Sequence, residues 1–139
     1  MYEYCRVIHV EDTDASGVIF FTNIQKIALE AFEEWLFSKG VSLDHIFRQA
    51  SFLLPIVHAE ANYLSLVSVG DRLCARMTVY RIGSSSFTVS SQMINQQGVL
   101  VATVSIVHVV MDKKTNKSCP IPEEIRSLLQ TLMFESIKA

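Results

Sequence analysis

The sequence lacks the signatures of several common protein classes. It contains only three cysteines in 139 residues and no Cys-x-x-Cys pair, so nothing supports a zinc ribbon or a redox dithiol. No apolar run approaches the roughly 20 residues that span a bilayer, and the N-terminal segment lacks the basic and apolar blocks of a signal peptide. We therefore expect a cytoplasmic protein without a membrane span.

The sequence also has no strong excess of positive or negative charge. The formal net charge is -2, and there is no run of like charges. Nothing therefore predicts a basic surface for nucleic acid. The four histidines show no His-x-His or His-x-x-x-His spacing, and apart from Asp12 and Asp14 there is no cluster of acids typical of a hard-cation loop. We expect no nucleic-acid partner, no metal and no other cofactor.

Apolar residues, in contrast, are abundant. Half of the chain is hydrophobic and 19% is charged, a balance that argues against disorder. The length suits a single domain over residues 1–139 with one core. Cys5 and Cys74 lie in strand-like segments, where they are predicted to be small core fillers.

The spacing of the apolar residues predicts one long central helix and several strands. Residues 23–38 carry apolar side chains at three- and four-residue steps, the pattern of an amphipathic helix. Alternating or β-rich segments predict strands at 2–10, 54–67, 72–80, 86–95 and 99–111, with an irregular or helical piece at 42–50 and a closing helix at 123–137. Short turns favour antiparallel neighbours. We expect an α+β fold whose sheet wraps the helix and whose uncovered surfaces are completed by oligomerisation.

The segment "EDTDASGVIFFTN", residues 11–23, combines features suited to acyl transfer. Gly17 permits a tight turn, and the helix that follows begins with N–H groups that lack partners within it. An oxyanion placed there would be stabilised, since removal of one such donor typically costs about 3–4 kcal/mol of barrier. A neighbouring carboxylate could attack a carbonyl or activate water. Spacing alone leaves open the alternative that the aspartates only cap the helix or form turns.

This segment resembles the signature of the hotdog-fold acyl-CoA thioesterases of the 4-hydroxybenzoyl-CoA thioesterase family. The matching positions are Asp12, Asp14, Gly17, Val18, Ile19 and Phe20. The stretches "HVEDTDASGVIFF", "EAFEEW" and "LPIVHAEANYLSLVSVGDRL" look most like the 1,4-dihydroxy-2-naphthoyl-CoA hydrolases, which act in phylloquinone and menaquinone synthesis. The resemblance implies a hotdog fold, in which an antiparallel sheet wraps a long central helix.

The resemblance also assigns roles around the thioester. Asp14 is implied as the catalytic carboxylate, acting as nucleophile or as general base on the thioester carbonyl. The main-chain N–H of Phe21 is implied as the oxyanion donor, so the side chain at that position is free to vary. Gly17 is expected to let the backbone approach the substrate, and Asp12 to brace the loop.

The residues that contact the substrate match the family's pattern less well than the catalytic residues do. Where the 4-hydroxybenzoyl-CoA enzyme grips the CoA phosphates with an Arg-Arg-Lys run, this chain has "RIGSSSF", so Arg81, Ser84 and Ser85 are the expected contacts. His58, which shares a strand face with Glu60, is expected to line the pocket. Together these two residues also raise the alternative of a hotdog dehydratase. The other histidines are predicted to be structural or surface groups: His9 beside the loop, His45 at the surface and His108 as a satisfied core or strand-face residue.

The function expected from the sequence is hydrolysis of an aromatic acyl-CoA, with 1,4-dihydroxy-2-naphthoyl-CoA favoured, by a homodimer or homotetramer. A wide apolar pocket would equally serve a fatty acyl-CoA or acyl-carrier-protein thioesterase. A protein of a different class, a non-catalytic acyl-CoA-binding hotdog protein, is the second alternative.

Overall fold

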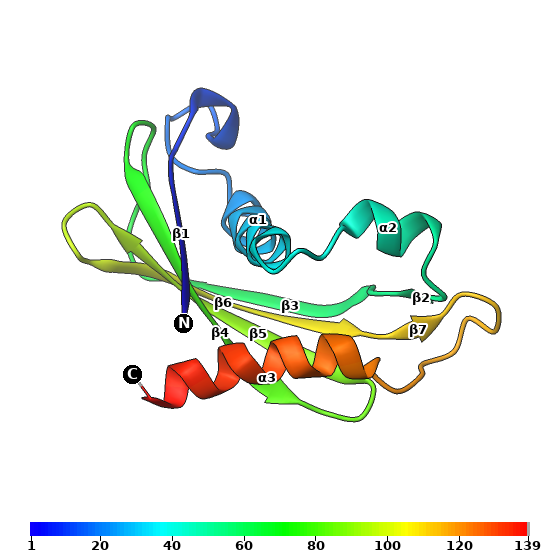
Figure 1. The fold of residues 1–139 in the computed structure, drawn as a ribbon. Helices are drawn as coiled ribbons and strands as arrows, with labels where there is room; N and C mark the ends of the chain where they lie inside the picture. The colour runs from blue at the N-terminus through cyan, green and yellow to red at the C-terminus, as the bar shows by residue number, and fades with distance from the viewer. Residues whose placement is uncertain (139) are drawn as a thin grey trace.

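A curved antiparallel sheet packs against one side of the long helix α1 (Asn23–Ser38) in the computed structural model, and a second helix, α3 (Glu123–Lys138), runs along the sheet (Figure 1). The structure describes residues 1–138, except for the side chains of residues 47 and 134–138. The five-stranded sheet has the order β1-β4-β5-β6-β3, and its strands are β1 (Tyr2–Val7), β3 (Ile56–Tyr63), β4 (Arg72–Ile82), β5 (Ser86–Asn95) and β6 (Leu100–Val109). The remaining elements are η1 (Val10–Asp12), α2 (Leu43–Arg48), β2 (Phe52–Leu53) and β7 (Met111–Asp112). The predicted α+β hotdog architecture is confirmed.

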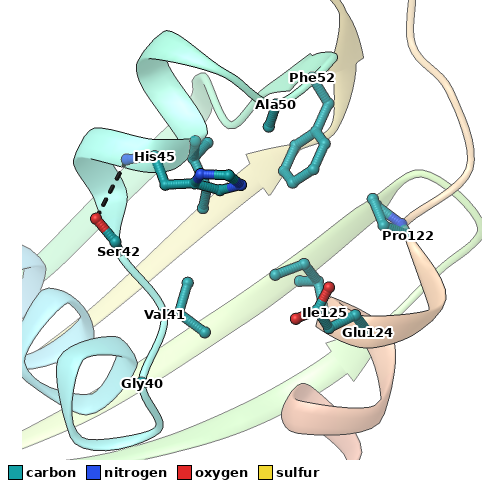
Figure 2. Close-up of a pocket in the computed structure, with 10 residues that line it drawn as sticks. Gly40, Val41, Ser42, His45, Ala50, Phe52, Pro122, Glu124 and Ile125 are labelled. Atoms are coloured by element: carbon teal, nitrogen blue, oxygen red, sulfur yellow. Dashed lines mark hydrogen bonds between the residues drawn. The ribbon is translucent and has the colours of Figure 1, made fainter.

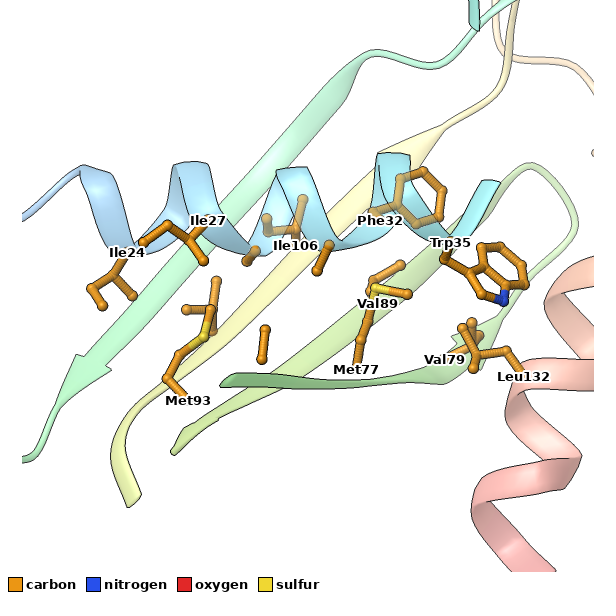
Figure 3. Close-up of a cluster of buried hydrophobic side chains, with 14 of the residues drawn as sticks. Ile24, Ile27, Phe32, Trp35, Met77, Val79, Val89, Met93, Ile106 and Leu132 are labelled. Carbon is orange, nitrogen blue, oxygen red and sulfur yellow. The ribbon is translucent and has the colours of Figure 1, made fainter. Parts of the chain in front are cut away.

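Helix α1 supplies one side of the hydrophobic core, and the concave face of the sheet supplies the other (Figure 3). The predicted stripe is buried in full, from Ile24 to Leu36. Facing it are Met77, Val89, Met93 and Ile106 from three neighbouring strands. Each fully buried large apolar side chain contributes about 1.5–3 kcal/mol. This packing fixes the direction in which the N-terminus of α1 points.

The two faces of the sheet differ in polarity because side chains alternate along each strand. On β6, Val104, Ile106 and His108 are buried toward α1, while the intervening residues are half exposed. The other face carries polar side chains, including Glu60 and Asn62 of β3. Helix α3 packs along β4 and buries apolar residues of its own, among them Leu129 and Leu132.

The expected strand at 54–67 is shorter in the structure. Pro55 separates β2 from β3, because proline cannot donate a hydrogen bond to a ladder. Beyond Tyr63 the backbone leaves the sheet, where Leu64 N donates to Val101 O at 2.9 Å and Val67 O accepts from Ile19 N at 2.7 Å. The end of β3 therefore supports the segment that precedes α1.

The prediction that Cys5 and Cys74 are small core fillers is wrong. The register of β1 and β4 places them directly opposite each other, and they form a disulfide with an S–S distance of 2.02 Å. Both are half-buried. Sequence spacing does not reveal the pairing, because 69 residues separate the two cysteines.

The sheet has two edges of unequal length. β1 has six residues, whereas β3 has eight, and seven of these eight are exposed. Such a long edge exposes unpaired backbone groups to another strand. Within the described residues, no helix combines the length and apolar character needed to cross a bilayer.

Candidate active site

The loop between η1 and α1 is held as a compact turn. Asp14 N donates to Val18 O at 2.9 Å, and Gly17 N donates to Asp14 O at 3.1 Å. Gly17 has φ +80°, a left-handed conformation that strongly favours glycine, and its carbonyl accepts from Val69 N at 3.0 Å. The segment that contains Val69, just before β4, therefore holds the loop at Gly17.

Asp12 anchors the base of this loop. Its side chain is buried and accepts from Arg6 Nη1 at 3.0 Å, from Arg6 Nη2 at 2.7 Å and from His9 N at 2.8 Å. The Arg6 guanidinium, with the His9 amide, lowers the pKa of Asp12 below its usual range. The Asp12 carbonyl also accepts from Phe20 N and from Asn23 Nδ2. Asp12 thus ties the loop both to β1 and to the start of α1.

Asp14 lies at the exposed tip of the same loop. Its Oδ1 accepts from the Ser16 amide at 2.8 Å and from the Ser16 hydroxyl at 2.5 Å. These bonds lower the pKa of Asp14, so its carboxylate is ionised at neutral pH. The Val18 amide also interacts with the carboxylate and makes a smaller contribution to the lowered pKa. Both hydrogen bonds from Ser16 end on Oδ1, so that oxygen is the one the turn holds in place.

Phe21 lies two residues before the first residue of α1. Its N–H has no acceptor within the described part of the chain, as expected for a donor at a helix start. Its side chain is 62% exposed and lies beside Phe20, with ring centroids 4.8 Å apart. Asp14, Gly17 and Phe21, the three predicted groups, all lie on the loop between η1 and α1.

The predicted CoA contacts gather elsewhere, around the β4–β5 connection. Arg81 is exposed near the end of β4, Ser84 is exposed, and Ser85 is half-buried. The carbonyls of the connection are engaged: Ser84 O accepts from Ile121 N at 3.0 Å, and Ser85 O accepts from Val110 N at 2.8 Å. The Ser84 and Ser85 amides have no acceptor among the described residues, which leaves them free to bind an anion.

These two groups of residues lie at opposite ends of the sheet. The Asp14 loop contacts Val67 and Val69, next to the end of β5, whereas Ser84 and Ser85 immediately precede its start. β5 has ten residues, which at about 3.3 Å per residue span roughly 30 Å. A substrate that contacts both groups within one chain would have to cover this distance.

His58 is apart from both groups. It pairs with Val107 of β6, on the face of the sheet that points away from α1. Its Nε2 lies 3.6 Å from Glu60 Oε2, and both side chains are well exposed. The structure does not bring His58 to the Asp14 loop.

Residues 8–129 match the thioesterase-like superfamily. The chain belongs to this superfamily. A 1,4-dihydroxy-2-naphthoyl-CoA hydrolase of Rippkaea orientalis is 31% identical, over 94% of this chain and 96% of that protein. The predicted family resemblance is therefore confirmed.

Solved structures of the superfamily share the fold. A 1,4-dihydroxy-2-naphthoyl-CoA thioesterase from Synechocystis matches with a TM-score of 0.89 and 28% identity, covering 94% of this chain and 96% of that one. A gentisyl-coenzyme A thioesterase matches with a TM-score of 0.80 and 26% identity, covering 89% and 98%. Both names describe thioesters of hydroxylated aromatic acids.

One contact of this thioesterase-family chain has no counterpart in the sequence-based predictions. Arg126 of α3 donates to Gly83 O at 2.7 Å and to Ser84 O at 3.2 Å. It holds a positive charge beside the predicted CoA contacts. Arg126 is the fourth residue of α3 and belongs to no recognisable motif. The sequence therefore gave no signal for this contact, which depends on how α3 packs.

A cavity of about 360 Å³ lies between the α1–α2 connection, α2 and the start of α3 (Figure 2). Val41, Phe52 and Ile125 contribute apolar walls, and His45 points toward the same space. This cavity lies beyond the C-terminal end of α1, whereas the Asp14 loop precedes its N-terminal end. Within one chain it is therefore not part of the Asp14 site.

Proposed function

We propose that this thioesterase-family protein hydrolyses 1,4-dihydroxy-2-naphthoyl-CoA to 1,4-dihydroxy-2-naphthoate and CoA, in phylloquinone or menaquinone synthesis. The observation that carries the proposal is an exposed, ionised Asp14 whose Oδ1 is held by Ser16, on a loop that also presents the unpartnered Phe21 amide. The named activities of the similar hydrolase and thioesterase support the choice of acyl group.

The chemistry requires a nucleophile and a site for negative charge. Asp14 either attacks the thioester carbon to form an acyl anhydride, which water then hydrolyses, or removes a proton from water as it attacks. In both routes the carbonyl oxygen becomes negative and accepts a hydrogen bond from the Phe21 N–H. The C–S bond breaks and CoA leaves as a thiolate that takes up a proton. Because its pKa is lowered, Asp14 is ionised in either route.

A homodimer would complete this site. The exposed β3 edge is flanked by large apolar side chains that are accessible in the single chain: Phe20, Phe21, Ile56, Val57, Tyr63, Leu64 and Leu66. Two β3 edges that pair in antiparallel fashion would remove the open edge and cover this surface. The Asp14 end of one copy would then adjoin the Ser84 end of the other. One substrate could contact both without spanning the sheet.

The substrate contacts proposed for Arg81, Ser84 and Ser85 follow from this arrangement. The free amides of the β4–β5 connection and the positive charge of Arg126 provide donors for CoA phosphates. His58, on the outer face of β3, would not contact the acyl group in such a dimer. We also predict that the protein acts in the cytoplasm, as a homodimer or as a homotetramer formed from two dimers.

Release of free thiol from a panel of thioesters tests the proposal. We expect faster release from 1,4-dihydroxy-2-naphthoyl-CoA than from palmitoyl-CoA or a palmitoyl-acyl carrier protein. Faster release from the fatty thioesters would favour a fatty acyl-CoA or acyl-carrier-protein thioesterase. Tight binding of the naphthoyl thioester with no thiol release above the uncatalysed rate would favour an acyl-CoA-binding protein and overturn the proposal.

A further inference from the structure

A second cavity lies between α1 and the β3–β6 pair. It has a volume of about 190 Å³ and is lined mainly by apolar side chains, namely Leu29, Phe32, Leu43, Leu54 and Ile56, with Glu33 and His108. An apolar cavity of roughly 150 Å³ can accommodate a benzene ring. The volume and lining therefore suit an aromatic group.

His108 is the unusual member of this lining. It is only 4% exposed, on the face of β6 that otherwise buries valine and isoleucine. Its ring stacks on Phe87, with centroids 5.0 Å apart, and lies 4.8 Å from the Phe32 ring. These contacts fix the plane of the imidazole.

Neither ring nitrogen of His108 has a hydrogen-bond partner of good geometry among the described residues, and the Leu54 backbone interacts only weakly with the ring. Burial lowers the pKa of His108 to about 4, and the weak hydrogen bond with the Leu54 backbone opposes this shift to a smaller extent. The imidazole is therefore neutral at pH 7, with one nitrogen as a donor and the other as an acceptor. A buried polar group without a partner is uncommon in native proteins and calls for a specific explanation.

We propose that this cavity receives the ring of the acyl group and that His108 recognises a hydroxyl group on it. This inference rests on the proposed function. A phenolic hydroxyl can both donate and accept, so it can satisfy whichever nitrogen of the neutral imidazole faces it. Phe32 supplies an aromatic neighbour for the rest of the ring system.

The position of the cavity agrees with the proposed dimer. Ile56 lines the cavity and pairs with His108 across β3 and β6, at the Ser84 end of the sheet. In an antiparallel pair of β3 edges, this end adjoins the Asp14 loop of the second copy. The acyl ring would then occupy the cavity of one copy while Asp14 of the other acts on the thioester carbon.

The test compares two substrates that differ only in their hydroxyl groups, 1,4-dihydroxy-2-naphthoyl-CoA and 2-naphthoyl-CoA. We expect His108→Leu to lower kcat/KM about 10- to 100-fold for the hydroxylated thioester, as loss of a buried hydrogen bond implies. The value for 2-naphthoyl-CoA should change by less than about threefold, since that substrate offers no hydroxyl to recognise. Comparing ratios between enzymes cancels the intrinsic reactivity of each thioester.

Two control variants separate recognition from packing. Leu54→Ala alters the same cavity without removing a polar group, so it should affect both substrates by a similar factor. His108→Gln keeps a donor and an acceptor and should retain part of the preference, which also provides a second variant if His108→Leu does not fold.

The possible outcomes are distinguishable. If the wild-type protein releases no thiol from either substrate, the proposed function fails. If it hydrolyses both substrates, and folded His108→Leu and His108→Gln keep the wild-type ratio of kcat/KM values, the recognition role of His108 is wrong while the proposed function stands.

Discussion

The base and the tip of the loop before α1 each carry an aspartate, two residues apart, in opposite environments. Asp12 is 2% exposed, and its oxygens accept from Arg6 and from the His9 amide. Asp14 is exposed, and its carboxylate interacts with Ser16 and the Val18 amide, which are neighbours within the same turn. Both carboxyl groups have lowered pKa values, but the causes differ. A lowered pKa therefore does not by itself identify the group that performs chemistry.

Connectivity distinguishes the two residues better. Arg6, which holds Asp12, also places Nε 3.0 Å from Glu30 Oε2 on α1, so the pair belongs to a network that joins β1, the loop and the helix. Asp14 joins no other element through its side chain among the described residues. We infer that Asp12 positions the loop and that Asp14 is the catalytic residue.

The largest expected effect comes from Asp14→Asn. This substitution removes the negative oxygen but keeps the size of the side chain, so we expect kcat to fall by about 10²- to 10⁴-fold. The folded structure should persist because the side chain is exposed. Thiol release and thermal unfolding measured on the same preparation check both parts. A variant that hydrolyses the thioester at close to the wild-type rate would contradict the catalytic assignment.

The matched substitution Asp12→Asn should act mainly on stability. It leaves Arg6 without its main partner at a largely buried position, and we expect the free energy of unfolding to fall by about 1–3 kcal/mol. Denaturant titration measures this loss. Activity per folded molecule should fall far less than in Asp14→Asn. The comparison breaks down if Asp12→Asn abolishes hydrolysis without lowering stability.

The effect of Asp12→Asn should also depend on pH. The pKa of Asp12 is lower in the folded state than its usual value of 3.8, so the unfolded state binds more protons as the pH falls below that value. The stabilisation is therefore fully present above pH 3.8 and is lost as the pH falls through the folded-state pKa. The difference in stability between wild type and Asp12→Asn should shrink in the same range. A difference independent of pH would indicate that the ion pair is not its cause.

The smallest effect is expected from Ser16→Ala. Removal of the hydroxyl that stabilises the ionised Asp14 should raise the pKa of this carboxyl. The acidic limb of the kcat/KM profile should then move to higher pH, while activity on the plateau changes little. An unchanged acidic limb in an active variant would show that a group other than Asp14 controls it.

The periodicity of apolar residues predicted those features of the fold that depend on neighbouring residues in the sequence. The apolar stripe of α1 and the bounds of β5 were both predicted from periodicity, and the assignment of Asp14 and the Phe21 amide to one catalytic site stays a prediction. The disulfide, by contrast, depends on the register between β1 and β4, and spacing along the chain carries no information about it.

Packing between segments distant in the sequence also explains the features of His108, His58 and Arg126 that the sequence did not predict. His108 was expected to be a satisfied core or strand-face histidine. It is buried, but neither of its ring nitrogens has a hydrogen-bond partner of good geometry among the described residues. His58 follows a register shift in the β3–β6 pair, and its outward orientation depends on that pairing. Arg126 reaches the β4–β5 connection only because α3 packs along β4.

Mixing two inactive variants tests the central claim, that Asp14 of one copy acts on an acyl group held in the cavity of another. The variants are Asp14→Asn and Leu54→Trp, the second of which fills the cavity beside His108. A mixed dimer contains one intact site, so random pairing should restore about a quarter of the wild-type thiol release. Co-purification through different affinity tags verifies that the subunits have exchanged. If mixed dimers form and release no more thiol than the separate variants, the account of a site shared between two copies is contradicted.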